Sequence, residues 1–153
     1  MLPTPTKVTV VAGDGEADHK LTAFDVALLA AGIGNLNLVK VSSIVPPGCE
    51  PVDKLDIPPG ALTPTAYGAV MSDVKGERIA AAIAVGFSEN DFGVIMEFSG
   101  RCTKEEAERA VRSMVEEAFR YRNMHLRDMR VASAERVVGD RPAAVVAAAV
   151  LWY

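Results

Sequence analysis

The sequence predicts one α+β domain spanning residues 1–153, an αββα-type sandwich with a mostly antiparallel or mixed sheet. Half of the residues are apolar, and 153 residues are enough to bury a hydrophobic core. Short β-branched runs alternate with two helical patterns, in the order strand, helix, strand, hairpin, strand, helix, strand, strand. No internal repeat or low-complexity linker divides the chain.

The balance of charges excludes several classes of partner. The chain has 16 basic and 20 acidic residues and a net charge of −4, which is not typical of a nucleic-acid-binding protein. It has no leading signal segment and no apolar run long enough to span a membrane, so we expect a cytoplasmic protein without nucleic-acid or membrane partners. Cys49 and Cys102 lack metal-ligand spacing, and we expect free thiols and no metal site.

The first strand and helix follow from local patterns. Residues 7–12 are β-branched and predict a strand that ends in a surface turn at Gly13-Asp14-Gly15. Residues 21–31 predict a largely buried helix, with Thr22 as its N-cap and Asp25 as the capping-box partner. A carboxylate in the first turn of a helix is stabilised by backbone N–H groups and the helix dipole. This structural role alone would explain an aspartate at position 25.

Residues 36–42 predict a second strand, which runs into Ser42-Ser43 and is stopped by Pro46-Pro47. A constrained hydroxyl at this point can attack the preceding carbonyl. Attack by Ser43 on the Ser42 carbonyl gives an ester by N→O acyl shift, and β-elimination then breaks the chain. The alternative is that both are ordinary turn serines.

The second half of the chain predicts a hairpin, a strand, a helix and two closing strands. The helix has a capping box at Thr103 and Glu106 and a regular apolar stripe. The expected ranges are 65–74 and 77–85 for the hairpin, 92–98 for the strand, 103–122 for the helix, and 127–138 and 143–153 for the closing strands.

Glu97 is a carboxylate in one of the most apolar predicted strands. It shares a strand face with Ile95, whereas Val94 and Met96 take the opposite face. Burial without a partner raises the pKa of a carboxyl group and makes it a proton donor near neutral pH. The alternative is an ion pair with an arginine such as Arg101.

Four stretches carry a resemblance to a known family. They are GIGNLNLVKVSSIVPPG at 32–48, AFDVAL at 23–28, GALTPT at 60–65 and IMEF at 95–98. Together they resemble the pyruvoyl-dependent arginine decarboxylases, in the family's order and over nearly the whole chain.

The resemblance implies a proenzyme that cleaves itself between Ser42 and Ser43. A short chain, 1–42, and a long chain, 43–153, would result. Ser43 would become a covalent pyruvoyl group, the only cofactor expected. The substrate amine would form a Schiff base with it, and L-arginine would be converted to agmatine and CO2.

The resemblance also assigns residue roles. Asp25 would receive the substrate guanidinium, for which a carboxylate is a two-pronged partner. Glu97 would return a proton to carbon, and Asn37 would hydrogen-bond an oxyanion. Gly34 would offer its backbone to the substrate.

Six residues of extended chain span roughly 20 Å, so Asn37 does not reach Ser43 of its own chain unless the chain bends. We therefore expect Asn37 and Asp25 to serve a site completed by a neighbouring subunit. This agrees with the homotrimers, with sites between protomers, that the resemblance implies.

Other functions remain open at this point. Asp25 would also suit histidine, lysine or ornithine, so the substrate of a pyruvoyl decarboxylase is not settled. An uncleaved, non-catalytic paralogue is a further alternative. The sequence does not distinguish polyamine synthesis from acid resistance as the destination of agmatine.

Overall fold

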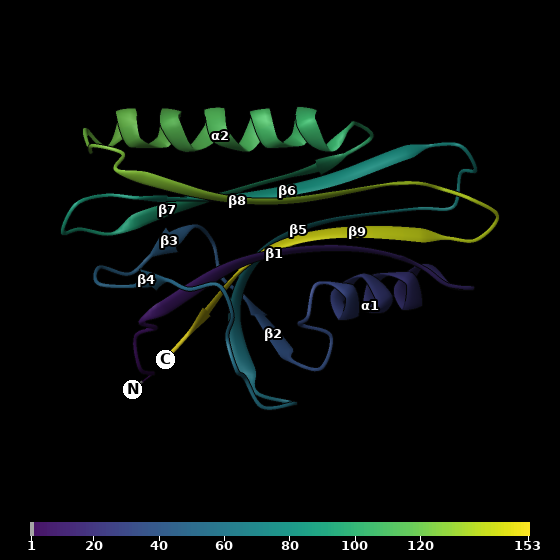
Figure 1. The fold of residues 1–153 in the computed structure, drawn as a ribbon, viewed down its shortest axis with the longest axis horizontal. Coiled ribbons are helices and arrows are strands. Elements are labelled where there is room, and N and C mark those ends of the chain that lie inside the picture. Colours follow the sequence, from purple (N-terminus) through teal and green to yellow (C-terminus); the bar gives the residue numbers. More distant parts are fainter. Residues whose placement is uncertain (1) are drawn as a thin grey trace.

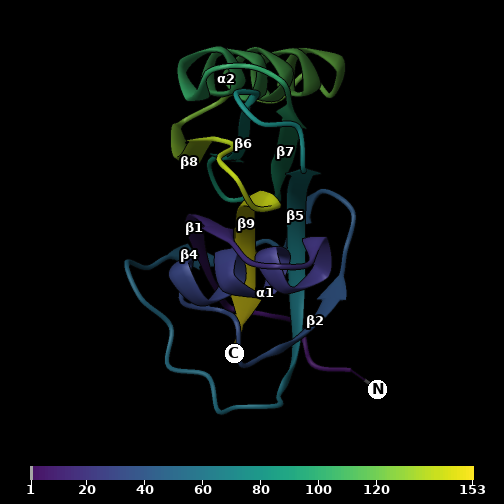
Figure 2. The ribbon, with the colours of Figure 1, turned by 90° about the vertical axis from the view of Figure 1, so that its right-hand side faces the viewer.

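The computed structural model describes residues 2–153 and has four layers. Helix α1 (Lys20–Ala30) covers one sheet, helix α2 (Lys104–Tyr121) covers the other, and the two sheets pack face to face between them (Figures 1 and 2). The predicted αββα sandwich with mixed and antiparallel sheets is therefore confirmed.

The strands in the described residues are β1 (Lys7–Glu16), β2 (Asn37–Lys40), β3 (Ile44–Val45), β4 (Glu50–Pro51), β5 (Leu62–Ser72), β6 (Arg78–Phe87), β7 (Gly93–Gly100), β8 (Asp128–Val137) and β9 (Ala143–Trp152). The first sheet has the order β2-β5-β9-β1-β4. The second sheet has the order β3-β7-β6-β8. Among the strands of residues 2–153, only β1–β4 and β2–β5 pair in parallel.

The core consists of three apolar layers. One lies between the sheets, one between α1 and the first sheet, and one between α2 and the second sheet. Strand β6 contributes side chains to two of these layers, one from each of its faces. Ile79, Ala81 and Ile83 face the first sheet, whereas Ala80 and Ala82 face α2, where small side chains let the helix approach.

The predicted hairpin at 65–74 and 77–85 is wrong in its pairing. Strand β5 pairs with β2 and β9 in the first sheet, whereas β6 pairs with β7 and β8 in the second. The turn at Gly76, where φ is +88°, carries the chain from one layer to the other. Strands β5 and β6 each have an apolar face. Because the two strands lie in different sheets that pack face to face, both apolar faces are buried between the sheets. Pairing side by side in one sheet would leave these faces without that cover.

The surface turn predicted at Gly13-Asp14-Gly15 is also wrong, because β1 continues to Glu16. A Cβ atom at Gly13 would lie 2.4 Å from the Ala27 carbonyl oxygen of α1. The glycines therefore let the helix backbone lie directly on the strand.

Helix α1 begins earlier than predicted. His19 is the N-cap residue, with extended backbone angles and no side-chain capping bond, so Thr22 and Asp25 lie within the helix rather than at its cap. Only one face is buried, through Ala23 and Ala27, and Leu21 on the other face is 74% exposed. The helix-cap explanation for Asp25 therefore fails.

Helix α2 agrees with its prediction. Thr103 accepts a hydrogen bond from the Glu106 backbone N–H at 3.1 Å, and the Glu106 side chain accepts one from the Thr103 N–H at 3.3 Å. Within residues 2–153, neither helix is long and apolar enough to cross a membrane.

Candidate active site

The Ser42-Ser43 pair lies where the chain crosses from one sheet to the other. On one side, the Val41 N–H donates to the Thr65 carbonyl of β5 at 3.1 Å, which extends the β2 pairing in the first sheet. On the other side, the Ser43 carbonyl accepts from the Ile95 N–H of β7 at 2.7 Å, in the second sheet. The peptide between the serines therefore lies between two residues, Val41 and Ser43, that are anchored in different layers.

Ser43 is a half-buried residue at the bend that immediately precedes β3. In β3, Ile44 is exposed and Val45 is buried in the layer between the sheets. Alternation extended back from Val45 would place the Ser43 side chain on the side that faces the first sheet.

Glu97 lies on the same side of the second sheet, two residues beyond Ile95 on β7. Ile44 pairs with Val94, so Ser43 is opposite Ile95 and diagonal to Glu97. Diagonal neighbours in a sheet are about 7–8 Å apart, close enough for a small substrate to contact both side chains. The predicted division of faces along this strand is confirmed, since Val94 and Met96 pack with α2.

The electrostatic environment of Glu97 suits a proton donor. Burial raises the pKa of the Glu97 carboxyl above its usual value, and the positive charge of Lys40 partly opposes that rise. The alternative, an ion pair with Arg101, is not what the structure contains, because Arg101 pairs with Glu77. Ser72 also donates a hydrogen bond to Glu77, at 2.5 Å.

Lys40 is the residue of this region that the sequence interpretation missed. Its Nζ atom lies 4.7 Å from the centre of the Tyr67 ring. The sequence shows only a lysine near the end of an edge strand, where exposed lysines are common. Its proximity to Glu97 depends on packing between two sheets and has no local signal.

Asn37 and Gly34 lie near the start of β2, away from Ser43. The Asn37 side-chain amide donates to the Gly60 carbonyl at 2.9 Å, and its backbone N–H donates to Ala61 at 3.0 Å. From Asn37 to Val41 the chain is paired with β5 and spans about 13 Å. No bend therefore brings Asn37 to Ser43 within one chain.

Asp25 is exposed on α1, on the outer side of the first sheet. It lines a shallow hollow with Leu21, Thr22, Phe24 and Leu28. Among residues 2–153, no lysine, arginine or histidine forms an ion pair with it. Of the predicted site residues, Ser42 and Ser43 thus lie near Glu97, whereas Asp25, Gly34 and Asn37 lie elsewhere in the described chain.

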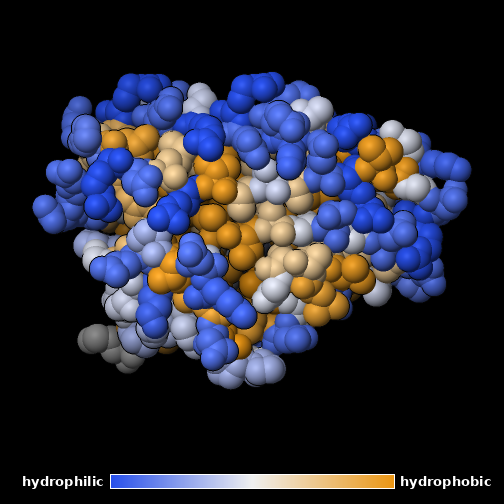
Figure 3. All heavy atoms as spheres, viewed as in Figure 1, coloured by the Kyte–Doolittle hydropathy of each residue, from blue (hydrophilic) through white to orange (hydrophobic). Residues whose placement is uncertain are grey.

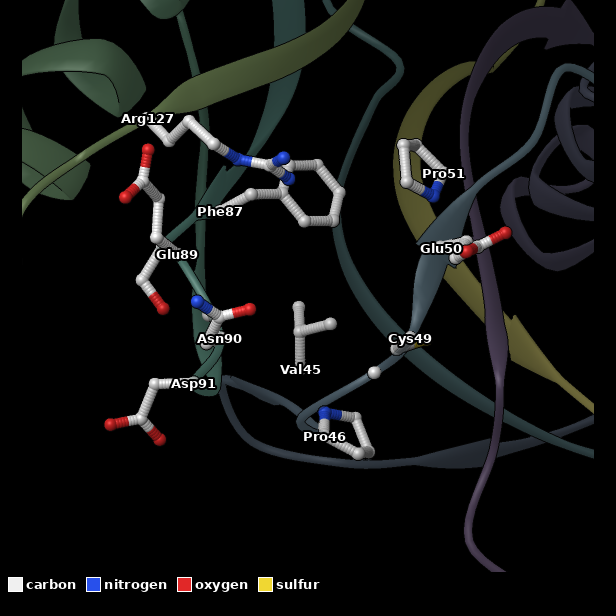
Figure 4. Close-up of a pocket in the computed structure, with 13 residues that line it drawn as sticks. Val45, Pro46, Cys49, Glu50, Pro51, Phe87, Glu89, Asn90, Asp91 and Arg127 are labelled. Atoms are coloured by element: carbon white, nitrogen blue, oxygen red, sulfur yellow. The ribbon is translucent and has the colours of Figure 1, made fainter.

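A separate pocket of about 390 Å³ opens beside the crossing segment (Figure 4). Glu89 and Asp91 lie on one side of this view and Glu50 on the other. Cys49 is in its wall, and burial raises the pKa of the thiol to about 11, so it is protonated at neutral pH and unreactive. No group of residues in the described chain could hold a metal ion.

Comparisons with known proteins identify the family of this chain. The family model of the pyruvoyl-dependent arginine decarboxylases matches residues 7–153. A pyruvoyl-dependent arginine decarboxylase of Pyrococcus abyssi is 51% identical over 152 residues, covering 97% of this chain and 96% of its own. One of Methanocaldococcus jannaschii is 46% identical over 151 residues, covering 97% of this chain and 91% of its own.

The chain belongs to the pyruvoyl-dependent arginine decarboxylase family. It is thus an enzyme of the decarboxylase class, and its cofactor is a covalently bound pyruvoyl group.

Gly68 of β5 provides a test of the position of Glu97. A Cβ atom at Gly68 would lie 3.3 Å from the Glu97 Cβ atom, so Gly68→Ala should displace Glu97 by a few tenths of an ångström. We expect about a tenfold loss of decarboxylation rate, because catalysis is sensitive to small misplacements. Gly100→Ala is the matched control, since a Cβ there meets nothing within 4 Å. Equal rates in both variants, at equal thermal stability, would contradict the placement of Glu97.

Proposed function

We propose that the chain is a self-processing enzyme that converts L-arginine to agmatine and CO2, with its pyruvoyl group derived from Ser43. One observation carries the proposal. Ser43 and the half-buried Glu97 lie diagonal to each other on one face of the second sheet, where the chain crosses between layers.

Processing begins when the Ser43 Oγ atom attacks the Ser42 carbonyl carbon, and the acyl group moves from nitrogen to oxygen. Elimination then breaks the Cβ–Oγ bond of residue 43 and releases chain 1–42 with a free carboxylate. Water replaces the nitrogen of the remaining dehydroalanine, ammonia leaves, and a ketone caps chain 43–153. The anchors at Val41 and Ile95 limit the motion of the bond that must rearrange.

We expect chain 1–42 to stay bound to chain 43–153 after cleavage, because strand pairing and helix packing hold it in place. Strand β1 pairs with β9 over ten residues, from Lys7 to Glu16, and lies between β9 and β4 in the first sheet. Helix α1 packs through Ala23 and Ala27 on β1 and β9. Cleavage removes one covalent bond and leaves this packing intact.

The residues around Ser43 fit a pyruvoyl group, because Ser43 is half-buried where the chain crosses between the sheets and is close to the protonatable carboxyl of Glu97. When formed, the group supplies the electron sink for loss of the substrate carboxylate. Glu97 then delivers a proton to the substrate carbon. Burial keeps the Glu97 acid protonated to a higher pH than an exposed glutamate, which suits this role.

Asp25, Asn37 and Gly34 are proposed to complete the site of a neighbouring protomer in a homotrimer. Within one chain they are separated from Ser43, as the extended β2 requires. Asp25 lies in a hollow beside the exposed Leu21, and hydrophobic surface is visible over the region of α1 (Figure 3). A partner subunit would cover this apolar surface and bring Asp25 to a second Ser43.

A panel of amino acids tests the substrate. L-arginine should be decarboxylated with a higher kcat/KM than lysine, ornithine or histidine, because a guanidinium makes a paired contact with Asp25. Asp25→Asn should reduce kcat/KM for arginine by about 10- to 100-fold. A preference for histidine or lysine in the wild-type enzyme would overturn the assignment of arginine.

Mixed oligomers test the shared site. Ser43→Ala and Asp25→Ala protein, unfolded and reassembled in equal amounts, should regain about one quarter of wild-type activity, because that share of interfaces joins an intact Ser43 to an intact Asp25.

The control mixture combines Ser43→Ala with Glu97→Gln. Both residues lie in the same half of the site, so no interface would contain an intact pair and activity should stay absent. Recovery in the control, or none in the first mixture, would refute the division of the site between subunits.

A further inference from the structure

We infer that Arg136 and Arg141 of the long chain (43–153) form a docking surface for the acidic segment 14–18 of the short chain (1–42). This ionic contact slows the release of the short chain from the processed enzyme. Its role rests on the proposed self-cleavage, because the two chains are separate molecules only after that step.

Retention of the short chain matters because this chain carries one half of the proposed site. Asp25, Gly34 and Asn37 precede the cleavage site in the sequence. Ser43 and Glu97 follow it. Cleavage therefore leaves the substrate-binding residues on a chain that is held by non-covalent contacts alone. An enzyme that lost this chain would keep its pyruvoyl group and lose its proposed guanidinium ligand.

Arg136 lies at the margin of the apolar layer between the two sheets. On β8, Ala134 packs against this layer, and Arg136 is the next residue on the same face. On β1 of the facing sheet, Asp14 likewise follows Ala12. The strand faces that form the apolar layer thus end in opposite charges that meet across the gap between the sheets.

Arg136 contacts two carboxylates of the short chain. Its Nη1 atom donates a hydrogen bond to Asp14 Oδ2 at 2.7 Å, and its Nη2 atom lies 3.5 Å from Glu16 Oε2. The Arg136 side chain is only 27% exposed. Partly buried charges are screened less by water and salt than fully exposed charges, so this contact is stronger than an ordinary surface ion pair.

Arg141 extends the contact from the β8–β9 loop to the segment before α1. Its Nη2 atom lies 3.7 Å from Glu16 Oε1, and its Nη1 atom lies 3.2 Å from Asp18 Oδ1. Glu16 therefore bridges both arginines and joins the pairs into one network. A network is the arrangement in which surface charges contribute measurably. Beside it, the Ala17 N–H donates to the Pro142 carbonyl at 3.1 Å and fixes this segment against the loop.

The charges of this network are sorted by chain, with every carboxylate on the short chain and both guanidinium groups on the long chain. One other ion pair recorded in residues 2–153 joins the two chains, between Lys20 and Asp73 at 3.6 Å, and both of its side chains are more than half exposed. The remaining recorded pairs lie within the long chain. The arginine network is therefore the main ionic contact between the chains in the described structure.

The test measures release of the short chain from processed enzyme that is immobilised by a C-terminal affinity tag. Every long chain is then bound to the resin, so a short chain in the wash has left its partner. The variant with Arg136→Met and Arg141→Met should release it about tenfold faster than wild type at low salt. About 1 M NaCl should accelerate release from wild type more than from the variant, because salt screens the network that the variant lacks.

Arg130→Met is the matched control. Arg130 is also an arginine of β8, but its ion pair is with Asp128 of the same chain, at 3.6 Å. This variant should release the short chain at the wild-type rate. If the double arginine variant fails to fold, Glu16→Gln removes the bridging charge from the other side and should also speed release. Wild-type rates of release in folded variants would overturn the inference.

Two further measurements on the same material separate this inference from the proposed function. Two chains in the denaturing mass spectrum, with unchanged release in the variants, would overturn the ionic contact and leave self-processing intact. One full-length chain would refute self-processing and, with it, a contact between separate chains. Decarboxylation on the resin should fall in step with release, because Asp25 leaves with the short chain. Faster release with undiminished activity would support the ionic contact and refute the role of Asp25.

Discussion

The peptide bond between Ser42 and Ser43 lies in a short segment whose flanking residues, Val41 and Ser43, are hydrogen-bonded to different sheets, and the arrangement of the site depends on this constraint. Val41 is fixed by its bond to Thr65 of β5, and Ser43 is fixed by Ile95 of β7. A connection of this length between two packed layers leaves little freedom to the peptide inside it. The sandwich brings the two sheets face to face, and the crossing occurs at their β2 and β3 edge.

The same constraint explains how the site is divided. The β2 strand must run straight beside β5 to deliver Ser43 to the second sheet, and this carries Asn37 and Gly34 away from it. Helix α1 holds Asp25 on the outer side of the first sheet, exposed and beside an exposed Leu21. Under the proposed shared site, one chain would present half of the site at each of two surfaces, and a closed oligomer would complete it.

The sequence allowed correct predictions where local patterns decide the structure. The capping box fixed the start of α2 at Thr103, and alternation put Glu97 on the inner face of β7. The errors concern tertiary packing. Gly13 looks like a turn residue but is a contact point for α1, and the strands flanking Gly76 look like a hairpin but lie in different sheets. The prediction placed Asp25 in the first turn of α1 because Thr22 resembles an N-cap residue. The N-cap is His19, so Asp25 lies beyond the first turn.

The candidate site was predictable in its composition but not in its geometry. Ser43 and Glu97 are 54 positions apart, and only the pairing of β3 with β7 brings them together. Lys40 was missed because it lies on β2, and its positive charge acts on Glu97 of β7 only after both sheets have packed.

The most direct test of the account is the intact mass of freshly purified native protein under denaturing conditions. The account predicts two chains, one ending at Ser42 and the other beginning at residue 43 with a carbonyl that gains hydrogen on treatment with borohydride. A single full-length chain with no carbonyl reactive to hydride would contradict it.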